Sequence, residues 1–398
     1  MNVPTLDFPS ARSVVVSQIS SQLPAGASCL APLHEAAGRV LARDAIADRD
    51  YPPVDRSLRD GFALRAEDLP GPLRVTGEVR AGEVFADRVG PGEAVEIMTG
   101  APVPAGANAV LMVEHATREG DSIRATRDLA PGAFINPQGS EIRAGAVAVP
   151  CGALLGFAEI AMLATAGYAE APVHPKPRVA ILATGDEIVE VAETPAPHQI
   201  RNSNACALAV QVTRAGGVAS ILPVARDNLE STKMLIEQGL TYDLLLLSGG
   251  VSAGKYDFVE DALASFGAEF FFDRVLIQPG QPLVFGRARD KFFFGLPGNP
   301  ASTMVCFEVF ARAAVEILAG RSCSPLALVA AKLTGEFRHK TGLTRFLPAH
   351  LNEGATVTPV PWSGSSDVAA LARANCFLVA DPDRESWQPG DWINVLLR

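Results

Sequence analysis

Residues 243–261 constrain the fold most strongly, because they join a strand, a glycine-rich loop and a helix start. The stretch opens with four leucines at residues 244–247, and a short apolar run bounded by turn residues predicts a buried strand. Three glycines and two serines then fall within seven residues, which leaves backbone N–H groups uncovered. Residues 257–260 have the Asp-x-x-Glu pattern of a capping box. A strand, a glycine loop and a helix N-terminus in this order favour binding of a phosphate or another anion.

This loop alone does not identify its ligand, since it fits neither the Walker A pattern nor G-x-G-x-x-G. A chain of 398 residues predicts about two to four domains. Hydrophobic residues make up 48% and charged residues 20%, which is typical of a globular protein. The formal net charge of -10 argues against a nucleic-acid surface, so an anionic ligand requires a local site.

Cysteine usage and the apolar segments indicate a cytoplasmic protein. The six cysteines contain no Cys-x-x-Cys pair, which fits a reducing compartment better than a zinc ribbon or a disulfide framework. The N-terminus lacks a basic segment followed by a long apolar core, so we expect no secretory signal. The most apolar helix candidate, residues 157–168, is short and contains Glu159, which predicts a buried helix and no membrane span.

The hydrophobic pattern changes several times along the chain. Helical spacing runs over residues 10–43, short strands separated by Gly and Pro turns occupy residues 72–149, and strands return after residue 325. We predict a discontinuous helical part at residues 1–50 and 145–176, an inserted β domain at 51–144, an α/β domain at 177–324, and a C-terminal β domain resembling a barrel at 325–398.

The α/β domain is predicted to be doubly wound and mostly parallel, because strands alternate with helices. The predicted strands are residues 178–183, 218–225, 244–247 and 292–296, and the predicted helices are 205–215, one opening at residue 227, and 301–318. In such a sheet, ligands bind at the carboxyl ends of the strands. The loops expected at that edge hold Glu187, Asp227, residues 248–257 and residues 297–300.

Carboxylates are the candidate chemical groups at this edge. The six histidines lack metal-ligand spacing, no Gly-x-Ser-x-Gly elbow is present, and we find no convincing nucleophile triad. Asp227 and Asp257 have an alternative use as helix N-caps, whereas Asp186 and Glu187 begin no obvious helix. Residues 55–60, with two Asp and two Arg, favour a solvated loop with internal ion pairs on spacing alone.

A cation is needed if these carboxylates surround a bound phosphate. A carboxylate about 4 Å from a phosphate charge costs roughly 4 kcal/mol at an effective dielectric constant of about 20. A helix N-terminus returns only about 0.3–1 kcal/mol. Mg²⁺ fits this requirement, because it takes one or two carboxylates together with substrate phosphates.

Five ordered motifs then resemble those of the molybdopterin molybdenumtransferases, the MoeA family that also includes the E domain of gephyrin. They are DRSLRDGFALR at residues 55–65, IMTGAPVPAGANAV at 97–110, TGDE with IRNSN at 184–204, SGGVSAGKYD at 248–257, and QPGQPLVFG with GLPGNPAS at 278–302. The middle domain alone also resembles molybdopterin adenylyltransferases and the competence-damage-protein family. The two β domains favour the MoeA family.

The resemblance implies that the chain moves molybdenum from molybdate onto adenylylated molybdopterin, with a divalent metal and release of AMP. It implies functional positions at Asp60, Thr99, Glu187, Asp227 and Asp257, of which Glu187, Asp227 and Asp257 handle metal and phosphate. The β domain of this family reaches the active site of the partner subunit, so a homodimer with composite clefts is implied. A molybdopterin adenylyltransferase is a candidate partner, and neither nucleic acid nor a membrane is expected.

The resemblance also implies a set of substrate-binding residues, which are Ser248, Gly249, Gly250, Ser252, Gly254, Lys255, Arg274, Gly298, Asn299, Pro300, Arg345 and Ser365. The chain departs from the family pattern in its basic residues. Gln278 and Gln281 stand where lysines are frequent, and Leu343 and Pro348 stand where the family often has arginines. These departures leave Arg274 and Arg345 as the nearest cations.

Two other functions fit the same residues. One is a related enzyme, either a molybdopterin adenylyltransferase or a nucleotide pyrophosphatase, built on the same middle domain. The other is a non-catalytic scaffold that binds pterin or molybdate, which the missing basic residues make conceivable. The intact set of Glu187, Asp227 and Asp257 favours the transferase, since a pure binder of anions has little use for three carboxylates.

Overall fold

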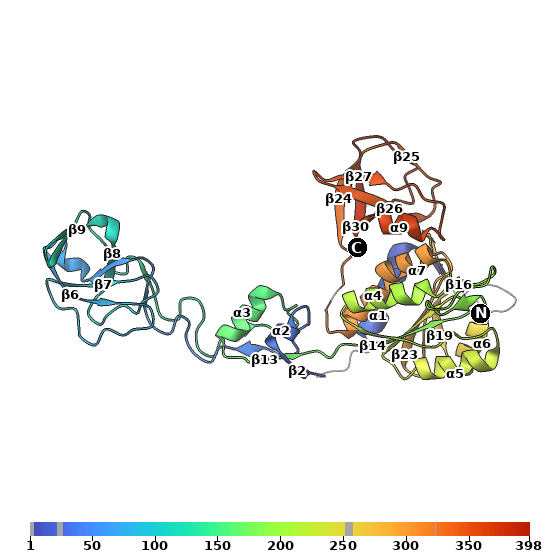
Figure 1. Cartoon of the computed structure of the whole chain (residues 1–398), viewed down its shortest axis with the longest axis horizontal. Helices are drawn as coiled ribbons and strands as arrows, with labels where there is room; N and C mark the ends of the chain where they lie inside the picture. The colour runs from blue at the N-terminus through green and yellow to red at the C-terminus, as the bar shows by residue number, and fades with distance from the viewer. Residues whose placement is uncertain (1–3, 22–26, 251–257, 323) are drawn as a thin grey trace. The chain divides into compact units, whose positions relative to one another are not determined.

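The computed structural model describes residues 4–21, 27–250, 258–322 and 324–398, which form two compact units (Figure 1). The large unit contains Met1–Leu30, Gly38–Ala42 and Pro172–Arg398, and the small unit contains Ala31–Ala37 and Arg43–Ala171. Four residues predicted to act at the site lie outside the described residues, namely Ser252, Gly254, Lys255 and Asp257.

A six-stranded sheet forms the centre of the large unit. Its order is β17 (Val218–Ile221), β14 (Arg178–Ala183), β18 (Leu244–Ser248), β23 (Lys291–Leu296), β22 (Val284–Ala288) and β19 (Glu269–Phe272). The first four strands are parallel, and the last two join them in antiparallel register. The predicted mostly parallel sheet is therefore confirmed.

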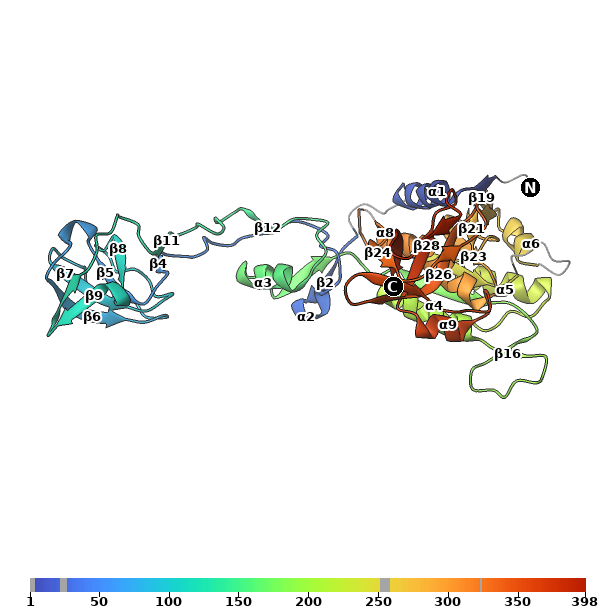
Figure 2. The same ribbon diagram turned by 90° about the horizontal axis from the view of Figure 1, so that it is seen from above.

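Helices cover both faces of this sheet, as its leucine strand requires. Leu244 and Leu246 pack into one buried cluster with α1 (Phe8–Ser20), α4 (Ser203–Arg214), α7 (Pro300–Cys306) and α8 (Arg312–Leu318). Leu245 and Leu247 pack into a second cluster with α5 (Leu229–Gly239) and α6 (Phe258–Ser265), which lie side by side in both views (Figure 1, Figure 2). Alternate side chains of β18 thus bury against opposite helical layers.

The predicted helix at residues 301–318 contains a π-helical turn, Phe307–Ala311, between α7 and α8. Arg12 of α1 donates from Nη1 to the carbonyl of Val309 in this turn, at 2.5 Å. The turn is completely buried, so a widened helix that presents a carbonyl to a guanidinium satisfies a polar group that water does not reach.

Two predicted elements are shorter than expected. The strand predicted at residues 218–225 ends at Ile221, and an isolated bridge further along joins Ala225 to Thr184. The helical spacing at residues 10–43 resolves into α1 and one short turn, α2 (Leu33–Ala36). Gly38 has a φ of +77°, and Leu41 then forms a bridge with Val173, so Val40 and Leu41 belong to extended chain.

The C-terminal part of the large unit is a closed five-stranded barrel, as the predicted barrel-like domain requires. Its strands are β24 (Leu328–Leu333), β26 (Thr344–Asn352), β27 (Thr356–Pro359), β28 (Cys376–Ala380) and β30 (Trp392–Leu397). The ring closes because β26 pairs with both β27 and β28, and β24 and β30 complete it. Outside the ring, β21 (Ile277–Gln278) pairs with β26 and ties the barrel to the chain of the α/β part.

The small unit contains the inserted β domain. Its six-stranded sheet has the order β8 (Ala109–Met112), β5 (Gly61–Leu64), β7 (Glu93–Ile97), β6 (Leu73–Val79), β10 (Ser122–Ala125) and β9 (Ala116–Glu119). A smaller layer holds β3 (Ala45–Ile46), β12 (Val147–Val149) and α3 (Phe157–Thr165). The prediction that residues 157–168 form a buried helix is wrong, because Phe157 is 93% exposed and Leu163 is the one fully buried residue of α3.

The remaining described elements are short. They are β1 (Thr5–Leu6), β2 (Cys29–Pro32), β4 (Arg56–Ser57), β11 (Ile135–Asn136), β13 (Glu170–Val173), β15 (Ile188–Val189), β16 (Ile200–Arg201), β20 (Arg274–Val275), β25 (Phe337–Arg338), β29 (Ser386–Trp387), α9 (Val368–Arg373) and two 3-10 turns, Ala66–Asp68 and Val113–His115. Within the described part of the chain, no helix has the length and apolar content that crossing a membrane requires.

Candidate active site

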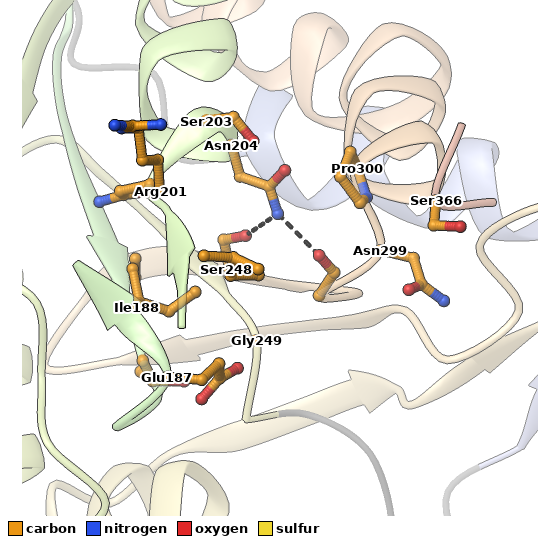
Figure 3. A pocket seen from close by; sticks show the side chains of 15 residues that line it. Glu187, Ile188, Arg201, Ser203, Asn204, Ser248, Gly249, Asn299, Pro300 and Ser366 are labelled. Atoms are coloured by element: carbon orange, nitrogen blue, oxygen red, sulfur yellow. Dashed lines mark hydrogen bonds between the residues drawn. The ribbon is translucent and has the colours of Figure 1, made fainter. Parts of the chain in front are cut away.

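A cavity of about 540 Å³ lies at the carboxyl ends of β14, β18 and β23, the edge where the sequence predicts the site (Figure 3). Its lining comes from four strand-end segments and the C-terminal part of the chain. The lining residues are Ala183, Thr184, Glu187, Ile188, Ile200, Arg201, Asn202, Ser203, Asn204, Ser248, Gly249, Gly298, Asn299, Pro300 and Ser366.

Glycines let two of these segments approach each other closely. Gly249 has a φ of +91°, and a Cβ on it would lie 2.9 Å from the carbonyl oxygen of Thr184. A Cβ on Gly298 would lie 3.7 Å from Cα of Gly249. The N–H of Gly249 donates to the carbonyl of Leu296 at 3.1 Å, which ties the loop after β18 to β23. Only glycine at position 249 permits this backbone path, so the cavity floor is main chain.

Glu187 places a carboxylate at the cavity, and its neighbour Gly185 makes room for it. A Cβ on Gly185 would collide with the Glu187 carboxylate, so the side chain folds back over a position that only glycine leaves open. Glu187 is exposed, and Figure 3 shows it near Gly249. The geometry supplies hard oxygen donors beside a glycine-lined floor.

Asp227 is joined to the same loop by a reciprocal pair of hydrogen bonds. The N–H of Asp186 donates to Oδ2 of Asp227, and the N–H of Asp227 donates to Oδ1 of Asp186, each at 3.3 Å. The N-cap of α5 is Asn228, whose side chain accepts from the N–H of Ser231 at 2.8 Å. Capping therefore does not account for Asp227, and its link to Asp186 keeps it beside the Glu187 loop.

Two predicted metal ligands, Glu187 and Asp227, thus lie on loops that a hydrogen bond joins through Asp186. The third predicted ligand, Asp257, is outside the described residues. No three His, Cys, Asp or Glu residues gather in metal-binding proximity among residues 4–21, 27–250, 258–322 and 324–398. Carboxylate oxygens are the donors that Mg²⁺ takes, so the two described residues fit the predicted metal in chemical type.

Asn299 begins α7 without capping it through its side chain. It occupies the N-cap position before Pro300, as predicted, but its side chain makes no capping hydrogen bond. It lines the first cavity and also a second one of about 330 Å³. Asn299 is therefore shared by the two cavities, whereas the predicted residues Gly298 and Pro300 line the first one.

The second cavity has an uncharged lining. It is formed by Ile277, Gln278, Pro279, Gly280, Gln281, Pro282, Pro297, Asn299, Ser302, Leu343, Trp362, Gly364 and Ser365. All of these belong to the described chain, and none is a lysine, arginine, aspartate or glutamate. The departures noted at Gln278, Gln281 and Leu343 thus fall together in one place.

The predicted cations lie away from these linings. Arg274 is in β20, paired with Thr5 of β1, and lines neither cavity. Arg345 of β26 pairs with Gln278 of β21 but is likewise absent from the residues that line the second cavity. Nε of Arg345 is buried and has no hydrogen-bond partner among the described residues.

Comparison with known proteins decides the family. A model of the MoeA N-terminal region, domains I and II, matches residues 8–167. A model of a probable molybdopterin binding domain matches residues 180–317, and a model of the MoeA C-terminal region, domain IV, matches residues 330–397. The chain belongs to the MoeA family. The resemblance drawn from the sequence motifs is confirmed.

Two curated relatives with one and the same name match this MoeA-family chain over most of their length. The molybdopterin molybdenumtransferase of Staphylococcus epidermidis is 33% identical over 377 residues, covering 92% of this chain and 90% of the relative. The protein of the same name from Staphylococcus aureus is 32% identical over 376 residues, with the same coverage. The molybdopterin biosynthesis moeA protein of Pyrococcus horikoshii OT3 superposes with a TM-score of 0.85 at 29% identity, covering 99% of this chain and 100% of that chain.

In the small unit, the structure joins the two predicted residues of the β domain. Oδ1 of Asp60 accepts hydrogen bonds from the backbone N–H of Thr99 at 2.6 Å and from its hydroxyl at 2.7 Å. These bonds, the backbone bond first, hold the pKa of Asp60 below its usual range. The expected internal ion pairs of residues 55–60 are wrong, because in this described loop Asp55 accepts from the N–H of Gln138 and Asp60 from Thr99.

Sequence reasoning missed several residues that line the first cavity of this MoeA-family chain. Arg201, Ser203 and Asn204 lie in the IRNSN motif, which served as a mark of the family without any assigned role. Arg201 donates from Nε to the carbonyls of Val191 and Glu193, at 3.0 and 3.1 Å, and so holds the loop between β15 and β16. The signal was the position of the motif, at the start of a helix that follows a strand-end loop.

Proposed function

We propose that this MoeA-family chain transfers molybdenum from molybdate to adenylylated molybdopterin and releases AMP, in the biosynthesis of the molybdenum cofactor. The observation that carries the proposal is the first cavity, where a main-chain floor at Gly249 and Gly298 faces the carboxylate of Glu187. Family membership and the name that its relatives carry, molybdopterin molybdenumtransferase, support the reaction.

A phosphate and a carboxylate in one cavity require a divalent ion. Their repulsion at about 4 Å is roughly 4 kcal/mol at an effective dielectric constant of about 20. We propose that Glu187 and Asp227, together with Asp257, hold Mg²⁺. When bound, the ion supplies positive charge that offsets the phosphate and assists departure of AMP.

The chain's own residues position the substrate and need no nucleophile. The floor glycines allow backbone N–H groups to approach a phosphate, and the Asp186–Asp227 link holds the carboxylate loop in place. None of the described cysteines lines either cavity. Attachment of molybdenum to a dithiolene depends on orientation and charge neutralisation, which this arrangement provides.

We further propose a homodimer in which the small unit of one chain completes the cavity of another. Asp60 and Thr99 supply a hydrogen-bonded polar pair for this purpose. The small unit also exposes apolar side chains at Ile46, Val147, Leu154 and Phe157, and Ile46 and Val147 are directly paired. Exposed apolar residues of this kind are typical of protein contacts. Sedimentation equilibrium should give twice the chain mass, and a fully active monomer would contradict the dimer.

Release of AMP by the purified chain tests the proposed reaction. We expect release from adenylylated molybdopterin that requires both molybdate and Mg²⁺. Release without molybdate would favour a nucleotide pyrophosphatase, and ATP-dependent adenylylation of molybdopterin would favour an adenylyltransferase. Binding of the substrate without release would favour a scaffold.

The uncharged second cavity leads to a prediction about anion affinity. Replacing Gln281 with Lys should lower the KM for molybdate several-fold, because a cation about 4 Å from an anionic charge is worth roughly 1–4 kcal/mol in a partly hydrated site. The expected dependence on salt also increases, since the added attraction is screened. Steady-state titration with molybdate at two ionic strengths measures both effects. The control is Gln238→Lys, which adds the same charge at an exposed position of α5 that lines neither cavity and should leave the KM unchanged. An unchanged KM in Gln281→Lys would contradict the predicted gain in molybdate affinity from a cation at this position.

A further inference from the structure

Asn204 makes more connections at the first cavity than any role in helix α4 requires. It is the second residue of that helix, and the helix is already capped by Asn202, which accepts from the N–H of Ala205 at 3.2 Å. The Asn204 side chain leaves the helix, and Nδ2 lies within hydrogen-bond distance of three acceptors from two other segments. They are Ser248 Oγ at 3.0 Å (Figure 3), the carbonyl of Gly298 at 2.8 Å and Thr303 Oγ1 at 3.2 Å.

These acceptors belong to the segments that form the cavity floor. Ser248 is the last residue of β18 and precedes Gly249, while Gly298 lies in the turn after β23. Thr303 is fully buried and donates in turn to the carbonyl of Pro297 at 2.5 Å. One amide group therefore joins α4 to both glycine segments, across 44 and 94 residues of sequence.

The other end of the same amide bears an unsatisfied atom. Oδ1 of Asn204 is buried and has no hydrogen-bond partner among the described residues. A buried acceptor left without a donor opposes folding. The orientation of the side chain is therefore set by the acceptors around Nδ2, because Oδ1 makes no hydrogen bond that would hold it.

We propose that Asn204 is a positioning residue that fixes the spacing between the Gly249 loop and the Gly298 turn. This inference rests on the proposed function for its kinetic consequence, because the two segments are there assigned to the substrate phosphate. Its structural content, the link itself, is independent of the reaction. Without the link, the phosphate-binding groups remain present but their separation is no longer held.

The same helix offers a matched control at Gln211. Its Nε2 donates to the carbonyl of Met304 at 3.1 Å and to Glu308 at 2.8 Å, so it also joins α4 to the α7 segment. Its Oε1 is likewise buried without a described partner. Gln211 lies seven residues after Asn204 on the same side of α4 and lines neither cavity. Both side chains are therefore amides that connect α4 to other segments, but only Asn204 connects it to the segments that line the first cavity.

The experiment compares Asn204→Ala and Asn204→Asp with Gln211→Met. Both Asn204 variants should lower kcat roughly 10- to 100-fold with a KM change below about 3-fold, because small displacements of positioning groups act on the reacting geometry. Asp has the shape of Asn but cannot donate to the Gly298 carbonyl, so shape alone should not rescue activity. Gln211→Met should keep kcat within about 2-fold even where its melting temperature falls.

A second measurement needs no substrate. Amide hydrogen exchange at Gly249, whose N–H bonds the carbonyl of Leu296, should accelerate in both Asn204 variants and stay at the wild-type rate in Gln211→Met. If the wild-type chain had no transferase activity, the proposed function would be wrong. The exchange test would remain valid, because it does not depend on the reaction. Wild-type exchange and wild-type kcat in Asn204→Asp, or equal losses in Gln211→Met, would overturn the positioning role.

Discussion

Replacing Glu187 with Gln should reduce kcat/KM for molybdenum transfer by at least about 100-fold, on the scale of losing one preorganised charged contact at a reacting phosphate. The variant keeps the shape of the side chain and removes its charge. Glu187 is an exposed carboxylate at the end of β14, folded over Gly185 and facing the cavity. Because Glu187 is exposed and lines the cavity, we propose that it supplies charge to a ligand and does not serve packing.

The stability of this variant should be unchanged although its activity falls. Surface substitutions of this type change the free energy of unfolding by less than about 0.5 kcal/mol, so the unfolding midpoint should match the wild type. The matched control is Glu190→Gln, an exposed glutamate three residues further along that does not line the cavity, and its activity should be unchanged. Wild-type turnover in Glu187→Gln would remove this residue from the proposed site.

Removal of divalent ions should abolish turnover, and Mg²⁺ should restore it. The reason is electrostatic, because Glu187 lines the cavity where a phosphate is proposed to bind and the linked Asp186–Asp227 pair adds negative charge on the adjoining loop. Chelation with EDTA followed by titration with Mg²⁺ measures the effect on AMP release. A monovalent salt of equal ionic strength is the control, since general screening does not replace a coordinated ion.

The metal requirement can also be separated from activity. Binding of Mg²⁺ to the wild-type chain, measured by calorimetry in the presence of AMP, should weaken at least about 10-fold in Glu187→Gln, as expected for loss of one carboxylate ligand. Full turnover in the presence of excess EDTA would rule out the proposed divalent ion. Turnover that needs the ion but binds it equally well in Glu187→Gln would move the metal site elsewhere.

The sequence predicted the α/β part well because its strands are buried on both faces. The run at residues 244–247 consists of four leucines, and each pair of alternating side chains fills a different helical layer. Such a short run has no polar face, so it predicts a buried strand. The glycine loop and the helix start then follow it in the sequence. The edge that carries the site then follows from the parallel topology alone, which is why Glu187, Ser248, Gly249 and residues 298–300 all reach the first cavity.

Some of the failures have a different cause, which is contact between residues that are distant in sequence. Val40 and Leu41 have helical spacing, yet Gly38 turns the chain and Leu41 bridges to Val173. Phe157 has a large apolar side chain of the kind that usually lies in a core, yet this side chain is almost fully exposed. Asn204 gained its role from partners 44–99 residues away, and spacing within a motif carries no information about such partners.

A single-turnover measurement tests the central claim most directly. The purified chain in excess over adenylylated molybdopterin, with molybdate and Mg²⁺, should release AMP and leave one molybdenum bound to the pterin for each AMP formed. Rapid quenching, nucleotide chromatography and metal analysis of the pterin fraction give both quantities. Equal yields of AMP and molybdenum-loaded pterin are the predicted result. AMP release that leaves the pterin free of molybdenum would contradict the proposed transfer.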